Sequence, residues 1–96
     1  MSQPARIPVS HNENAQRYET VIDDLHAFVV YELLGNQVAI THTYVPPELR
    51  GRSVAAALVK SALDDIRKAG RTVIPQCSYV QRFIQKNQDY ADLLAG

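Results

Sequence analysis

The run VAITHTYV over residues 38–45 has the two-residue period of a β-strand, with β-branched and aromatic residues throughout. Pro46 and Pro47 end this strand, because proline lacks the backbone donor that a sheet requires. Strict alternation predicts that four of its side chains share one face: Val38, Ile40, His42 and Tyr44.

The next segment, residues 54–69, changes to the 3.6-residue period of an amphipathic helix. Gly70 follows the last apolar position and Lys68, which is typical of a helix C-terminus. The apolar stripe predicts a helix that lies on a sheet, and it contains Val54, Ala55, Leu58, Val59, Ala62, Leu63 and Ile66.

Two earlier strands are predicted at residues 17–22 and 25–34, joined at Asp23-Asp24, and Gly35-Asn36 forms the next hairpin turn. The centre of residues 25–34 is apolar on both faces, which predicts a strand covered on both sides. Residues 72–76 form a fourth strand. A shorter helix follows over residues 78–87.

Within the short helix, Ser78 and Gln81 have the spacing of a capping box at its start. Three antiparallel strands followed by a right-handed helical crossover make the fourth strand parallel to the third. The predicted fold class is therefore α/β (α+β): a mixed, mostly antiparallel four-stranded sheet with one long and one short helix. Both parallel strands then end at the same edge of the sheet, where open sheets bind ligands.

Composition restricts the function classes. The 96 residues predict one domain over residues 17–96, preceded by a flexible tail over residues 1–16. The formal net charge is zero, which argues against a nucleic-acid partner and against binding to an anionic membrane. The single cysteine excludes an intrachain disulfide, and we expect a cytoplasmic protein that is a monomer or weak dimer. His11 has no neighbour at ligand spacing, so no metal site is predicted.

The segment RGRSVA over residues 50–55 lies between the third strand and the long helix. A helix N-terminus presents free backbone N–H groups and the positive end of the helix dipole, which together bind phosphate oxygens. Gly51 permits a sharp turn close to a ligand, and Arg50 and Arg52 add positive charge. Ser53 is a favoured helix cap. The segment therefore predicts an anion site for a phosphate-bearing cofactor.

The stretch HTYVPPELRGRSVAAALV resembles the acyl-CoA-binding motif of the GNAT N-acetyltransferase superfamily, Arg/Gln-x-x-Gly-x-Gly/Ala. Arg50 matches the first position of the motif and Ala55 the last, whereas Ser53 stands where the family usually has glycine. A second stretch, VIPQCSYVQRFIQKNQDYADLL, resembles the stand-alone GNAT branch of roughly a hundred residues, which carries a cysteine after the strand that follows the main helix. These resemblances cover the chain from about Arg17 onward.

The resemblance implies a minimal GNAT-like fold that binds acetyl-CoA and transfers an acetyl group to an amine. It implies that Cys77 is a catalytic candidate, with an acetyl-cysteine intermediate or direct attack by the amine both open. His42 is the other catalytic candidate, because it lies near the strand end that leads to the loop. The cofactor-binding residues implied are Val45, Arg50, Gly51, Arg52, Ser53, Val54, Ala55 and Asn87.

Other interpretations stay open at the level of sequence. Cys77 precedes a helix N-terminus, where the dipole favours a thiolate, but a free cysteine is also a common small buried residue. His42 is either a general base or a hydrogen-bonded core histidine, and Tyr79 is either a proton donor or a core residue. For the whole chain, the alternatives are a non-catalytic acyl-CoA-binding module and an interaction domain that binds another phosphate or acidic partner.

Overall fold

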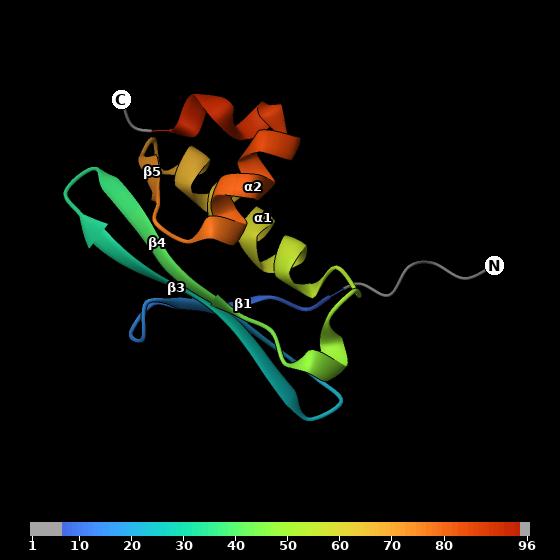
Figure 1. Cartoon of the computed structure of the whole chain (residues 1–96). Coiled ribbons are helices and arrows are strands. Elements are labelled where there is room, and N and C mark those ends of the chain that lie inside the picture. Colours follow the sequence, from blue (N-terminus) through green and yellow to red (C-terminus); the bar gives the residue numbers. More distant parts are fainter. Residues whose placement is uncertain (1–6, 95–96) are drawn as a thin grey trace.

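The fold is a single sheet with its helices on one face (Figure 1), in a computed structural model that describes residues 7–94. The elements in chain order are β1 (Ser10–Asn12), β2 (Arg17–Ile22), β3 (Leu25–Leu34), β4 (Gln37–Tyr44), the 3₁₀ segment η1 (Pro47–Leu49), α1 (Val54–Lys68), β5 (Thr72–Pro75), α2 (Ser78–Lys86) and the 3₁₀ segment η2 (Gln88–Leu93).

The strands lie in the order β1-β2-β3-β4-β5, with β1 to β4 antiparallel and β5 parallel to β4. The predicted meander and the parallel fourth strand are confirmed. The sheet also contains a fifth strand that the sequence did not predict, because β1 is short and polar and pairs only at the edge of β2. The tail predicted over residues 1–16 thus includes a strand, and residues 1–6 lie outside the described part of the chain.

Two-residue turns set the register of the hairpins. Asp23 and Asp24 both have positive φ, of 52° and 64°, as a tight turn between twisted strands requires. Gly35 has a φ of 63°, so the position needs the conformational freedom of glycine. Both turns lie where the sequence predicted them.

A β-bulge in β4 changes which face of the sheet each side chain of its second half occupies. Val30 pairs with His42 but Tyr31 pairs with Ile40, so Thr41 is an extra residue without an opposite partner. The Thr41 hydroxyl donates a weak hydrogen bond to the Val30 carbonyl, at 3.4 Å. The prediction that Val38, Ile40, His42 and Tyr44 share one face is therefore wrong, because the bulge shifts the alternation by one residue.

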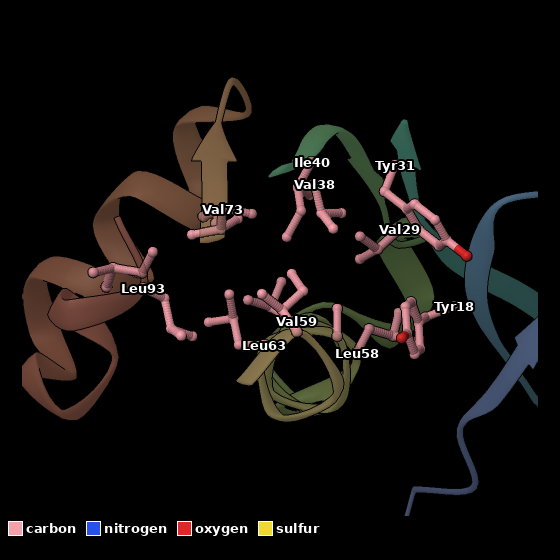
Figure 2. Close-up of a cluster of buried hydrophobic side chains, with 14 of the residues drawn as sticks. Tyr18, Val29, Tyr31, Val38, Ile40, Leu58, Val59, Leu63, Val73 and Leu93 are labelled. Carbon is pink, nitrogen blue, oxygen red and sulfur yellow. The ribbon is translucent and has the colours of Figure 1, made fainter. Parts of the chain in front are cut away.

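The core forms between the sheet and α1. Figure 2 shows Leu58, Val59 and Leu63 of α1 pointing toward the side chains of Val29 and Ile40 on the sheet. All five of these side chains are fully buried. Removing so much apolar surface from water is the main stabilising term in a domain of this size.

The opposite face of the sheet is not covered by a helix (Figure 1). Phe28 and Val30 lie on this face and are only half-buried, so the prediction that β3 is covered on both sides is wrong. The Arg17 guanidinium lies 4.7 Å from the centre of the Phe28 ring and shields part of it. Below, this surface is called the open face.

The helix ends differ from the sequence prediction in their capping. Ser53 precedes α1 but makes no side-chain cap hydrogen bond, and its φ of 62° places it in the left-handed region. Ser78 and Gln81 form no capping box, because the Gln81 amide donates instead to the Pro75 carbonyl at 2.9 Å. Gly70 has a φ of 71° after α1, as a C-terminal stop predicts.

Candidate functional site

The β4 and β5 strands diverge toward their carboxyl ends. Their pairing ends at Ile40↔Pro75, and the N–H groups of both Gln76 and Cys77 donate to the Ile40 carbonyl at 3.1 Å. Within the described residues, β4 continues to Tyr44 without a strand partner on this side. The backbone groups on this edge of β4 are therefore available to a ligand.

The loop that follows β4 leads directly into the N-terminus of α1. Its last part contains Gly51, with a φ of 79°, and Ser53, and both residues have left-handed backbones. This conformation orients the loop so that the first turn of α1 has no side-chain cap. The N–H groups of this turn are therefore not capped by the Ser53 side chain, and free N–H groups of this kind are what an anion site requires.

A cavity of about 510 Å³ connects the diverging strand to the helix N-terminus. This volume lies within the range of small-molecule sites. Its walls come from the end of β4, the loop, the first turn of α1 and one residue of α2, and they comprise Thr43, Tyr44, Val45, Leu49, Arg50, Gly51, Ser53, Val54, Ala55, Ala56 and Tyr79.

The structure brings six of the eight residues predicted for the cofactor into this cavity: Val45, Arg50, Gly51, Ser53, Val54 and Ala55. Arg50 is held in place because its Nε donates to the Val45 carbonyl at 3.1 Å. Its remaining guanidinium N–H groups are thus positioned at the cavity wall.

Arg52 and Asn87 lie elsewhere. The Arg52 Nη1 atom is 3.5 Å from Asp23 Oδ2, so this side chain points toward the β2–β3 turn. Asn87 follows α2 and lines a neighbouring hollow of about 400 Å³, which also contains Lys60. Ser53 lines both spaces, so the hollow adjoins the cavity.

Cys77 lies at the point where β5 leads into α2. Its Sγ atom is 3.4 Å from the Thr43 hydroxyl oxygen, and Thr43 lines the cavity. Cys77 is half-buried and packs against the edge of the core. The thiol is thus one side chain away from the cavity, at the same edge of the sheet as the Arg50 loop.

His42 lies on the other side of β4. It is exposed on the open face, and the centre of its ring is 6.3 Å from that of Phe28. Of the two interpretations of His42, the hydrogen-bonded core histidine is therefore wrong. Because the bulge at Thr41 places His42 on the open face and Thr43 on the helix side, the structure does not bring His42 and Cys77 together.

Thr43 and Tyr79 line the cavity, although the sequence predicted neither as a cofactor-binding residue. Only the bulge places Thr43 on the helix side of β4, and strict alternation did not reveal it. Tyr79 is in the first turn of α2, and partial burial raises the pKa of its hydroxyl. Its position within the apolar stripe of the short helix was the only signal in the sequence.

A meander joined by a helical crossover to a diverging parallel strand defines a GNAT-like α/β domain. The chain belongs to the GCN5-related N-acetyltransferase family, whose model matches residues 17–93. The chain is also similar to a GCN5-like putative N-acetyltransferase from Staphylococcus aureus, whose solution structure aligns with a TM-score of 0.73 and 26% identity. That alignment covers 94% of this chain and 89% of the bacterial one.

Curated relatives show the same similarity at the level of sequence. Protein NATD1 of Bos taurus is 31% identical over 84 residues, which cover 84% of this chain and 74% of the relative. The human Protein NATD1 is 29% identical over 90 residues, which cover 91% of this chain and 80% of the human protein. Among residues 7–94, no helix has the length and apolar character needed to cross a membrane.

Proposed function

We propose that this protein binds acetyl-CoA and transfers the acetyl group to an amine. The observation that supports this best is the cavity of about 510 Å³, which extends from a free helix N-terminus to the edge of a diverging strand. The diphosphate of acetyl-CoA requires a free helix N-terminus. Its extended pantetheine arm, which carries amides, requires an unpaired strand edge. Membership of the GCN5-related N-acetyltransferase family supports acetyl transfer in general.

In this proposal, the diphosphate of acetyl-CoA binds the backbone N–H groups of residues 51–55 and the guanidinium of Arg50. The pantetheine arm extends along the edge of β4 between residues 41 and 45, where β5 no longer pairs. A backbone N–H near Val45 holds the thioester oxygen and stabilises the negative charge that develops there. The hollow beside Asn87 and Lys60 takes the adenosine end, and Arg52 makes no contact.

For direct transfer, the amine nitrogen attacks the thioester carbonyl carbon, a C–N bond forms and the C–S bond breaks. Tyr79 lines the cavity, and its raised pKa keeps it protonated at neutral pH, so it supplies the proton to the departing CoA sulfur. The amine approaches between the diverging strands from the open face. His42 lies on that face and accepts the proton that the amine loses.

The second route uses Cys77. Its thiolate attacks the thioester, CoA leaves with its sulfur, and the acetyl-cysteine is then attacked by the amine. Thr43 orients the Cys77 sulfur through the contact at 3.4 Å. The two routes differ in whether an acetyl group is ever bound to the protein.

A non-catalytic acyl-CoA-binding module is the second candidate. It is favoured by one observation: Cys77 does not line the cavity itself, and His42 is on the opposite face of the strand. Such a module binds acetyl-CoA without turnover.

Two measurements test the proposed function. Acetyl-CoA at 100 times its dissociation constant adds about 2.7 kcal/mol of stability, which raises the melting temperature of a domain of this size by roughly 10 °C or more. No shift with acetyl-CoA contradicts both candidates. The intact mass after incubation with acetyl-CoA, followed by a panel of primary amines, then separates turnover from binding alone.

The Cys77→Ala and His42→Ala variants distinguish the routes. An adduct of one acetyl group that is absent in Cys77→Ala and is discharged by amines supports the cysteine route. Amine acetylation that persists in Cys77→Ala but falls in His42→Ala supports direct attack. Binding with neither adduct nor acetylated amine leaves only the module.

A further inference from the structure

A second cavity, of about 310 Å³, lies at the other end of α1. Its helix wall includes Asp65 and Ala69, whereas the first cavity contains Ala55. The two linings share no residue, and their nearest residues on the helix, Ala56 and Ala62, are six positions apart, which corresponds to about 9 Å. The second cavity is thus distinct from the site proposed for acetyl-CoA.

Three aromatic rings form one wall. The His11 ring stacks on Tyr18, with centroids 4.2 Å apart and an interplanar angle of 8°, and Tyr31 is tilted against both rings. The two tyrosine hydroxyls already have partners. Tyr31 OH lies 2.6 Å from His11 Nε2, and Tyr18 OH donates to Asp65 Oδ2 at 2.8 Å. These bonds hold the ring faces in place without using a ligand.

The formal charges of the lining come from three other side chains. Burial, above all, raises the pKa of both Tyr18 and Tyr31, so these groups are neutral at physiological pH. The charged groups are then the carboxylates of Glu13 and Asp65 and the guanidinium of Arg71. These three side chains carry one net negative charge, which favours a cation, and His11 adds a ring whose Nδ1 lies 3.9 Å from Asp65 Oδ2.

The inner wall is apolar. Val38, Ile40 and Ile66 line it, and each is at most 5% exposed. A space of about 310 Å³ accommodates roughly ten groups the size of a water molecule. Aromatic rings, carboxylates and an apolar floor together match an organic cation, because ammonium groups are attracted to both aromatic rings and carboxylates.

We propose that this cavity binds a small organic ammonium ion with an apolar body of about ten non-hydrogen atoms. The ammonium group lies between Glu13, Asp65 and the aromatic rings, and the apolar part contacts Val38 and Ile66. This site is separate from the proposed transfer of acetyl groups and does not depend on it. The cavity is therefore assigned to an effector and not to the acyl acceptor.

The test is an NMR titration of the full chain at pH 8 with 2-phenylethylammonium as the probe. We expect saturable shifts of the amides around residues 11–18, 31–33 and 62–71. We expect at least tenfold weaker binding for 2-phenylethanol, which lacks the charge, and for 3-phenylpropionate, whose charge is reversed. Equal affinity for all three molecules, or shifts confined to other residues, overturns the proposal.

Three variants locate the site. Glu13→Gln leaves the fold intact because this exposed side chain makes no hydrogen bond within the described residues, and it weakens binding of the ammonium probe about fivefold. Ala69→Leu, at an exposed position of the lining, blocks the cavity and abolishes binding. Glu32→Gln is the matched control, since Glu32 is exposed and does not line this cavity, and it leaves binding unchanged. Unaltered binding in both Glu13→Gln and Ala69→Leu contradicts the proposal.

Retention of acetyl-CoA binding in Glu13→Gln separates the two sites. If the unmodified chain does not bind the ammonium probe but still binds acetyl-CoA, the effector site is wrong and the proposed function stands. If the unmodified chain binds the probe but does not bind acetyl-CoA, the proposed function is wrong and the effector site stands.

Discussion

Ser53 is the residue at which this chain departs from the family motif, and its backbone explains why glycine is usual there. A φ of 62° is costly for a residue with a Cβ atom, by about 1 kcal/mol. Glycine adopts the same conformation without this cost. Ser53 therefore adds strain to the backbone, and its side chain does not cap α1.

We predict that Ser53→Gly raises the free energy of unfolding by up to about 1 kcal/mol, because it relieves the left-handed strain. Ser53→Ala changes stability by less than about 0.5 kcal/mol, since no cap hydrogen bond is lost. Loss of a true serine cap costs about 1 kcal/mol. Urea unfolding of both variants measures the difference, and a loss of 1 kcal/mol or more in Ser53→Ala would show that the serine does cap α1.

The two arginines of the loop differ in position, although they are only two residues apart. Arg50 lines the cavity and Arg52 points toward Asp23. We predict that Arg50→Ala weakens acetyl-CoA binding about tenfold, which corresponds to about 1.4 kcal/mol and to one lost charge-assisted hydrogen bond. Arg52→Ala is the matched control and changes affinity by less than twofold. Calorimetric titration of both variants checks this, and equal losses contradict the assignment.

At the scale of elements, the bulge in β4 determines which side chains are in the core. Ile40 is fully buried and His42 is exposed, although they are separated by a single residue. We predict that Ile40→Ala costs 2–5 kcal/mol, on the order measured for large-to-small core substitutions. His42→Ala costs less than about 0.5 kcal/mol, as at ordinary surface positions. Thermal unfolding of both variants decides this, and comparable losses would mean that the two side chains share one face.

Hydrogen bonds to charged side chains hold the C-terminal segment η2 against α1. Both guanidinium nitrogens of Arg67 contact the Asp92 carboxylate, at 2.8 and 3.0 Å, and these hydrogen bonds lower the pKa of Asp92. Burial alone would raise the pKa of Asp64, but hydrogen bonds from Tyr90 and Lys60 outweigh it and the pKa is lowered. A carboxyl with a lowered folded-state pKa stabilises the fold above its ordinary pKa of about 3.9 and loses that effect as the pH falls.

We predict that Asp92→Asn lowers the melting temperature at pH 6 and that its difference from the unmodified chain shrinks as the pH falls from about 4 toward 2. Asp89→Asn is the control, because Arg67 contacts only the backbone carbonyl of Asp89. Melting curves at several pH values provide the measurement. A difference for Asp92→Asn that is constant with pH would show that the ion pair has no part in acid unfolding.

The sequence predicted most elements because their patterns are long or sharply bounded. The helix over residues 54–68 has a continuous apolar stripe, and the turns at Asp23-Asp24 and Gly35 use residues that tolerate positive φ. The sequence did not predict the bulge, because threonine, histidine and tyrosine are acceptable on either face of a strand. Strand β1 is three residues long and polar, so no periodicity marks it. Arg52 was predicted from its charge and its place in the loop and Asn87 from the family resemblance, and neither determines the direction of a side chain.

For the whole molecule, chain direction accounts for the position of the candidate site. Helices cover one face of the sheet (Figure 1), and both parallel strands end at the edge where α1 begins. The cavity, the Arg50 loop and the Cys77 thiol are thus at the same edge. The opposite end of α1 carries the second cavity, so one helix separates the two sites.

The central claim is that acetyl-CoA binds along the β4 edge and onto the N-terminus of α1. An amide NMR titration of the full chain with acetyl-CoA tests it most directly, because the shifts report location as well as affinity. We predict saturable shifts concentrated in residues 41–45, 50–56 and 77–79, with little change at residues 11–18. Shifts that are absent at saturating acetyl-CoA, or that are confined to the other end of α1, would contradict the claim.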